Sequence, residues 1–112
     1  ISPSVADDLL DVLETSVGAY SGGRRARVEG YRVGGKTGTV RKTGQQGYAT
    51  DAYRSVFAGI APISDPRIVT VVMIDNPQAG QFYGGAVAAP VFSSVTGNAL
   101  RLLDVPPDHD VE

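Results

Sequence analysis

The sequence predicts an α/β (α+β) domain in which an antiparallel β-sheet is flanked by helices. Three observations support this: a helix-period apolar pattern near the N-terminus, three strand-like segments joined by short connections, and a second helical pattern near the C-terminus. Short connections favour antiparallel neighbours, because a parallel crossover needs roughly a dozen residues or more. At 112 residues the chain is at most one domain.

The first helix is predicted to begin just after Ser2. Serine is a favoured N-cap residue, and Pro3 suits the first helical position, where a missing N–H has no helical partner to lose. Apolar side chains then recur with helical spacing and form one stripe: Val5, Leu9, Val12 and Leu13. Of these, Val5, Leu9 and Val12 could supply a layer over the sheet. A loop is expected from Gly18 onward, because breaker residues cluster there.

The three predicted strands cover residues 28–40, 55–61 and 68–74. The second ends at Pro62, and the third is an unbroken, β-branched apolar run. Such a run is typical of a central strand that is covered on both faces, so Met73 is expected to be core. Three strands alone would leave sheet edges uncovered, and we therefore expect neighbouring elements outside this chain.

The second helix is predicted to begin near Val87 and to end before Pro106, with Pro90 in or near its first turn. Residues 108–112 are expected to form a flexible tail in which His109 is solvated, so the folded portion is predicted to span 1–107. Four apolar residues share the face of this helix that could supply a buried layer, with Phe92 and Leu103 beside them: Val91, Val95, Ala99 and Leu102.

Charge is unevenly spread along the chain. The net charge of −2 argues against a general nucleic-acid binder, and the absence of cysteine excludes disulfides and thiolate metal sites. A local positive field suits an anionic ligand group such as a carboxylate, although a solvated basic loop would show the same composition. Seven of the ten Lys and Arg residues lie close together: Arg24, Arg25, Arg27, Arg32, Lys36, Arg41 and Lys42.

Residues 30–37 (GYRVGGKT) fit the pattern of a phosphate-binding loop, G-x-x-x-x-G-K-T. That loop must pass into a helix at its Lys-Thr pair, so that helix amides face the phosphates. Here Gly38, Thr39 and Val40 follow, which favour a strand. A P-loop NTPase fragment is therefore the lesser interpretation.

The same segment contains Lys36, Thr37 and Gly38, the K-T-G box of penicillin-binding proteins and serine β-lactamases, followed by Thr39. Strand alternation places the two threonines on one side and the lysine on the other. Two hydroxyls can bind a substrate carboxylate, while the ammonium acts on a neighbouring proton relay. Gly38 lets a peptide or a β-lactam lie against the strand, where a backbone amide can face an oxyanion. The alternative is a strand with incidental threonines.

Four segments in order resemble the C-terminal part of the transpeptidase domain of class B penicillin-binding proteins, most closely the septal, FtsI-type peptidoglycan D,D-transpeptidases. The resemblance spans about residues 2–107. It implies the penicillin-binding transpeptidase or serine β-lactamase-like fold, of which only the C-terminal part is present. The segments are residues 30–42 (GYRVGGKTGTVRK), 52–62 (AYRSVFAGIAP), 75–80 (DNPQAG) and 82–92 (FYGGAVAAPVF).

The resemblance implies catalytic roles for the box. Lys36 would belong to the active-site hydrogen-bond network, and Thr37 and Thr39 would hold the terminal carboxylate of the donor peptide or of a β-lactam. The Thr39 amide, beside Gly38, would form half of the oxyanion hole.

The resemblance also implies substrate contacts. Arg41 would lie close to the box, and an aromatic wall would line the bound side chain. Simple packing against the strand or the loop is the alternative for each ring. The residues implied are Arg41, Tyr53, Phe82, Tyr83 and, where the loop turns or approaches the ligand, Gly84.

The family needs S-x-x-K for its nucleophile and base and S-x-N for its relay, and neither occurs in these 112 residues. The nucleophilic serine would therefore lie outside this chain, and the chain alone is expected to be inactive. A β-lactam-sensing or non-catalytic penicillin-binding domain is the alternative function.

The resemblance implies septal cell-wall synthesis through a serine acyl-enzyme that β-lactams inhibit. The implied partners are the missing N-terminal portion of the domain, peptidoglycan stem peptides, β-lactams and other division proteins, with no nucleic acid and no metal or organic cofactor. The implied location is the periplasmic face of the bacterial inner membrane, with an anchoring N-terminal segment that is absent here.

Overall fold

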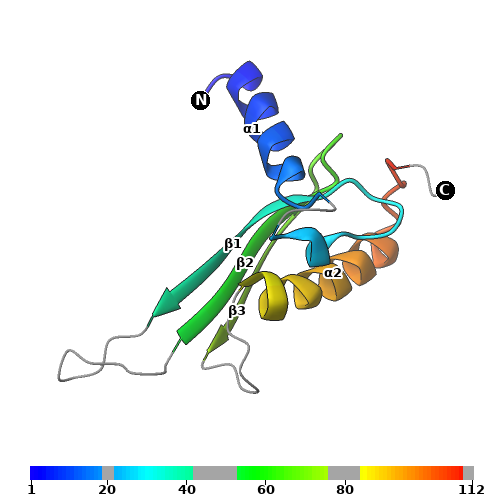
Figure 1. Cartoon of the computed structure of the whole chain (residues 1–112). Coiled ribbons are helices and arrows are strands. Elements are labelled where there is room, and N and C mark those ends of the chain that lie inside the picture. The colour runs from blue at the N-terminus through cyan, green and yellow to red at the C-terminus, as the bar shows by residue number, and fades with distance from the viewer. Residues whose placement is uncertain (19–21, 42–52, 76–83, 110–112) are drawn as a thin grey trace.

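The computed structural model describes residues 1–18, 22–41, 53–75 and 84–109. Three strands form one antiparallel sheet in the order β1-β2-β3, with a helix before it and a helix after it (Figure 1). The predicted order of helix, three-strand meander and helix is confirmed. In chain order the elements are α1 (Pro3–Thr15), the short 3-10 helix η1 (Arg24–Ala26), β1 (Gly34–Arg41), β2 (Tyr53–Ala61), β3 (Ile68–Asp75) and α2 (Gly84–Leu102).

The register of the sheet separates its two faces. Thr37 pairs with Phe57, and Lys36 pairs with Ala58. Because side chains alternate along a strand, Thr37 lies on the face of Phe57 and Lys36 on the opposite face. α2 packs across the Phe57 face, where the rings of Phe57 and Phe92 lie 4.8 Å apart between centroids. The core of this chain therefore lies between α2 and one face of the sheet (Figure 1).

The buried face of α2 differs from the predicted one. Val91, Val95 and Leu102 are 40%, 50% and 85% exposed. The neighbouring row of α2 side chains is buried instead, because Gly59 has no side chain and leaves space in the sheet for Phe92. A Cβ on Gly59 would come within 2.4 Å of the Phe92 ring. Small residues on either side let the helix approach closely. The fully buried row consists of Ala88, Ala89, Phe92, Thr96 and Leu100.

The prediction that the third strand is covered on both faces is wrong for this chain. Exposure alternates along β3. Val69, Val71 and Met73 are 70%, 65% and 61% exposed, so Met73 is not core. On the opposite face, Val72 and Ile74 pack against the α2 core. An apolar run shows that a strand can be buried on both faces, but the element that would cover the second face is not in the described part of the chain.

α1 follows the predicted bounds, and the backbone N–H of Val5 donates to the Ser2 side chain at 3.3 Å. Its apolar stripe is nevertheless exposed, with Val5, Leu9 and Val12 at 45%, 49% and 65%. The helix projects away from the sheet and meets β1 only near its C-terminal end (Figure 1). This stripe therefore does not supply the layer over the meander that the sequence allowed.

The first strand begins at Gly34 rather than at Val28. Val28 and Tyr31 form an isolated antiparallel bridge around a turn in which Gly30 has φ +87°. That conformation favours glycine and stops the extended pattern early. The Gly30 carbonyl accepts a hydrogen bond from the His109 backbone N–H at 3.2 Å, so the chain is fixed in the fold beyond the predicted boundary at residue 107.

Candidate active site at the outer edge of the sheet

β1 is an edge strand among the described residues, and it carries the K-T-G box along its length. The Gly35 carbonyl accepts a hydrogen bond from the Ser16 hydroxyl, which belongs to the end of α1 and not to the sheet. Gly35 therefore turns its backbone polar groups away from β2. Backbone orientation alternates along an antiparallel strand, so those of Thr37 and Thr39 also point outward. Such an edge can bind an extended peptide or an oxyanion.

The side chains of the box project from the two faces of this edge strand. Lys36 is exposed, and its ammonium Nζ donates to the Thr37 carbonyl at 3.0 Å. Thr37 is half-buried and Thr39 exposed, and both lie on the opposite face by register, as strand alternation predicts. One cation, two hydroxyls and outward backbone groups are therefore brought together over four residues.

The glycines of β1 differ in whether packing within the chain requires them. A Cβ on Gly34 would come within 2.9 Å of the backbone at Glu14, and one on Gly35 within 2.5 Å of the Phe57 ring. Packing within the chain thus requires both glycines. At Gly38 the nearest atom would be the Val56 Cβ at 3.8 Å, an ordinary contact. The space over Gly38 is open to a ligand or to another part of the domain.

The predicted substrate contacts are only partly described. Tyr53 opens β2, pairs with Arg41 at the end of β1 and lies on the same sheet face as Thr39. Gly84 is the first residue of α2. Phe82 and Tyr83 lie outside the described residues, as does the side chain of Arg41. An aromatic wall formed by the three rings therefore stays a prediction.

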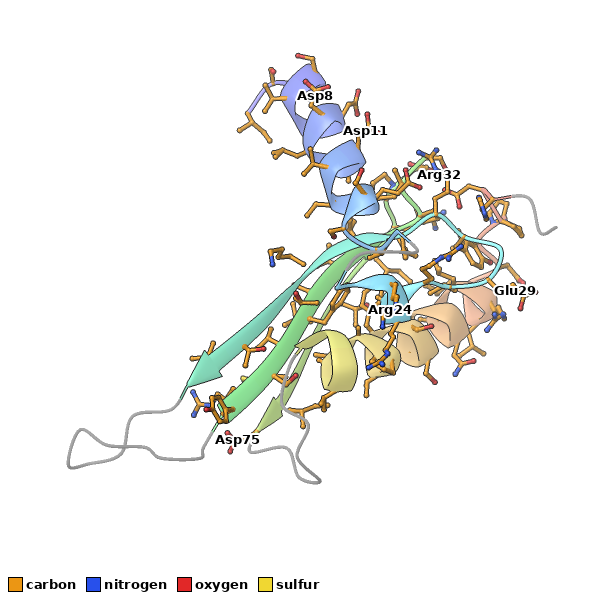
Figure 2. All side chains as sticks on the ribbon, viewed as in Figure 1. Asp8, Asp11, Arg24, Glu29, Arg32 and Asp75 are labelled. Atoms are coloured by element: carbon orange, nitrogen blue, oxygen red, sulfur yellow. The ribbon has the colours of Figure 1, made fainter. Side chains whose placement is uncertain are left out.

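The P-loop interpretation does not fit the backbone. Lys36 and Thr37 lie inside β1, which continues to Arg41, whereas a phosphate-binding loop passes into a helix at this pair. Two cations of the predicted basic cluster are placed elsewhere: Arg24 lies on η1, while Arg32 is engaged by the end of α1 (Figure 2). These two cations do not contribute to the K-T-G edge.

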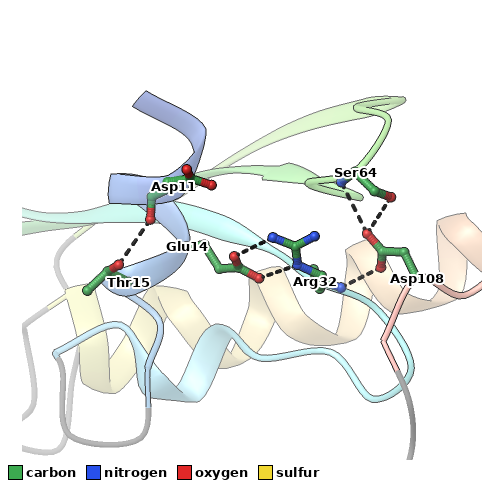
Figure 3. Close-up of polar contacts among 6 residues, drawn as sticks. All are labelled: Asp11, Glu14, Thr15, Arg32, Ser64 and Asp108. Carbon is green, nitrogen blue, oxygen red and sulfur yellow. Dashed lines mark hydrogen bonds and ion pairs between the residues drawn. The ribbon is translucent and has the colours of Figure 1, made fainter. Parts of the chain in front are cut away.

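A polar cluster that the sequence analysis missed anchors the entrance to β1 (Figure 3). The Arg32 guanidinium makes a bidentate ion pair with Glu14, donating from Nε and Nη2 at 2.8 Å each. The Arg32 backbone N–H donates to Asp108 at 2.6 Å, and Ser64 donates to the same carboxylate from its N–H at 3.2 Å and its hydroxyl at 2.7 Å. Residues far apart in sequence meet here, which no local pattern could indicate.

The cluster favours the ionised form of its two carboxylates. Hydrogen bonds from the Arg32 guanidinium lower the pKa of Glu14. Burial raises the pKa of Asp108, but the hydrogen bonds from Arg32 and Ser64 together outweigh it, and the net pKa is lowered. Asp108 therefore belongs to the folded part of the chain and not to a tail.

Replacing Glu14 by glutamine in the complete domain is expected to destabilise it at neutral pH by about 0.5–1 kcal/mol, the range for partly exposed ion pairs. Because folding lowers the Glu14 pKa, the ionised carboxylate stabilises the fold above its unfolded pKa of about 4.3, and this contribution is lost as pH falls through the lower folded value. The difference between Glu14→Gln and wild type in urea unfolding should therefore shrink on acidification. Asp7→Asn, at an exposed position of the same helix, is the control. A difference that does not change with pH would contradict this role.

A K-T-G box on the outer strand of an antiparallel sheet that is backed by a helix fits the class of penicillin-binding proteins and serine β-lactamases. The family described as the penicillin-binding protein transpeptidase domain matches residues 1–97. The chain belongs to this family.

Individual relatives agree. The probable peptidoglycan D,D-transpeptidase PbpC of Pseudomonas aeruginosa is 47% identical over 109 residues, which are 97% of this chain and 19% of that protein. The peptidoglycan D,D-transpeptidase FtsI of Escherichia coli K12 is 42% identical over 105 residues, 94% of this chain and 18% of that protein. The chain thus spans about a fifth of the length of these relatives.

Among solved structures, the apo transpeptidase domain of penicillin-binding protein 3 from Burkholderia pseudomallei matches with a TM-score of 0.87 and 44% identity, covering 98% of this chain and 33% of that one. The predicted fold class, as a fragment of the domain, is confirmed. Within the described ranges, no helix is long and apolar enough to cross a membrane, and no group of three or more His, Cys, Asp or Glu side chains could hold a metal ion.

Proposed function

We propose that this chain is the C-terminal part of a peptidoglycan D,D-transpeptidase domain that cross-links stem peptides in septal cell-wall synthesis. The observation that supports this most directly is the edge of β1, where Lys36 and the outward backbone groups of Thr37 and Thr39 lie together. Membership of the transpeptidase family and the likeness to FtsI support the septal assignment.

The chemistry is an acyl transfer shared with the portion of the domain outside this chain. The serine of that portion attacks the carbonyl between the two D-alanines of a stem peptide, an ester to the serine forms, and the terminal D-alanine leaves with a proton. An amine of a neighbouring strand then attacks the ester, and the serine recovers its proton. A β-lactam acylates the same serine and stops the cycle.

In this proposal β1 binds and orients the donor. The hydroxyls of Thr37 and Thr39 hold the terminal carboxylate, and the Thr39 N–H stabilises the oxyanion as it forms. The Lys36 ammonium acts on the proton relay that serves the serine. The open space over Gly38 lets the donor lie against the strand.

The remaining assignments concern the substrate side chain and the setting of the enzyme. Tyr53 lies on the sheet face of Thr39 and would form one part of an aromatic wall. The domain would work at the periplasmic face of the inner membrane, anchored by an N-terminal segment, together with other division proteins. The further residues proposed for the substrate site are Arg41, Phe82, Tyr83 and Gly84.

The test is to express the complete protein, including the portion that precedes this chain. Fluorescent penicillin is expected to label it covalently, and a pentapeptide donor with an amine acceptor is expected to yield free D-alanine and a cross-linked product. No labelling would overturn the proposal. Labelling without any turnover of the donor would support the β-lactam-sensing alternative instead.

A further inference from the structure

We propose that Ser16 is a positioning residue for the strand that carries Lys36, Thr37 and Thr39, an inference that rests on the proposed function. Ser16 is the C-cap of α1, and its hydroxyl reaches across to the Gly35 carbonyl at the outer edge of β1. It thereby links the last turn of the helix to the residue that immediately precedes the K-T-G box.

The strand needs an external support at this point because of its composition. Gly34 and Gly35 are consecutive, and glycine is the residue with the greatest backbone freedom. Neither can be exchanged for a stiffer residue, since a Cβ would collide with the end of α1 or with the Phe57 ring. The backbone ahead of Lys36 is therefore held by contacts from outside the strand and not by side chains of its own.

Ser16 is itself well fixed. Its backbone N–H donates to the Val12 carbonyl at 3.3 Å, and its own carbonyl accepts from the Gly23 N–H at 3.1 Å. Its hydroxyl is also within 2.8 Å of the Leu13 carbonyl, so one hydrogen is shared between the helix and the strand.

Its neighbour Thr15 provides the natural comparison. The Thr15 hydroxyl is exposed and donates to the Asp11 carbonyl at 3.0 Å, the ordinary bond of a hydroxyl to its own helix. The Ser16 hydroxyl likewise contacts a carbonyl of its own helix, that of Leu13, and it also contacts the Gly35 carbonyl in the sheet.

The contact fixes the peptide unit that leads into the box. The Gly35 carbonyl and the Lys36 N–H belong to one rigid plane, so holding the carbonyl sets the orientation of the lysine backbone. A tilt of this plane would also move the outward groups of Thr37. Small displacements of catalytic groups lower the rate of the chemical step far more than they lower affinity.

The experiment uses the complete domain and compares Ser16→Ala with the matched control Thr15→Ala. β-Lactam acylation is resolved into a binding constant and an acylation rate constant, at a temperature where all variants are folded. Ser16→Ala is expected to lower the acylation rate constant roughly tenfold, the size expected for one lost hydrogen bond, with little change in binding. Thr15→Ala should leave both constants unchanged, and Ser16→Thr, which keeps the hydroxyl, should restore most of the rate.

Hydrogen exchange of the β1 amides provides a readout independent of activity, and it should accelerate in Ser16→Ala but not in Thr15→Ala. If Ser16→Ala changes neither the acylation rate nor this exchange, or lowers only the melting temperature, the proposal is overturned. If the wild-type domain is not acylated at all, the proposed function fails, and the exchange comparison still decides the role of Ser16. Should Ser16→Ala fail to fold, Ser16→Cys takes its place, since it keeps the shape but only a weak donor.

Discussion

Replacing Lys36 by alanine in the complete domain is expected to lower the rate of β-lactam acylation by roughly 10²- to 10⁴-fold, the range for a group that assists proton transfer. The lysine is exposed and its ammonium donates to the Thr37 carbonyl, so its removal leaves the fold of β1 intact. Stopped-flow acylation measures the effect directly.

Two further variants define the origin of this loss. Arg67→Ala removes an exposed cation from the turn between β2 and β3, and it should leave acylation unchanged. Thr37→Val keeps the shape of the side chain but removes a hydroxyl from the carboxylate site, and a loss comparable to that of Lys36→Ala is expected. An unchanged acylation rate in Lys36→Ala would contradict the proposed role of the K-T-G box in acylation.

Residues 1–112 expressed alone are expected to show no cooperative thermal unfolding and no labelling by fluorescent penicillin. One face of the sheet exposes Val69, Val71 and Met73, and the apolar stripe of α1 is exposed as well. Apolar surface of this kind is normally covered, and β3, the last strand of the sheet that the structure describes, has an edge that favours association with other chains. We therefore infer that the rest of the domain covers these surfaces.

The two halves of this prediction are tested separately. Calorimetry that shows a sharp, reversible transition of the isolated chain would defeat the folding half. Covalent labelling would defeat the chemical half, because no serine in the sequence has a lysine three residues later to activate it. The complete domain, measured under the same conditions, is the positive control for both.

Local patterns predicted the order of the elements and several of their ends, because local physics determines them. The Ser2 cap set the start of α1, Pro62 ended β2, and alternation placed Lys36 and Thr37 on opposite faces. The face of α2 could not be predicted in this way. Two neighbouring rows of apolar residues on α2 could each have been the buried face. The choice depends on the space that Gly59 of β2 leaves for Phe92, which the sequence of the helix does not contain.

Other features depend on residues that are distant in sequence or outside the chain. Glu14 and Asp108 lie 18 and 76 residues from Arg32 in the sequence, and only the tertiary fold brings them together. Val69, Val71 and Met73 are exposed because no described element covers that face of β3, and the residue pattern of the strand contains no information about its cover. Of the candidate site, the strand and its box were predictable, whereas the support that Ser16 provides was not.

Two contacts join the last turn of α1 to the entrance of β1, and this has a mechanical consequence. Glu14 pairs with Arg32, and the Ser16 hydroxyl reaches the Gly35 carbonyl. Two attachment points a few residues apart resist rotation as well as separation, whereas a single one would act as a hinge. A force applied to α1 is therefore transmitted to the backbone that leads into the K-T-G box.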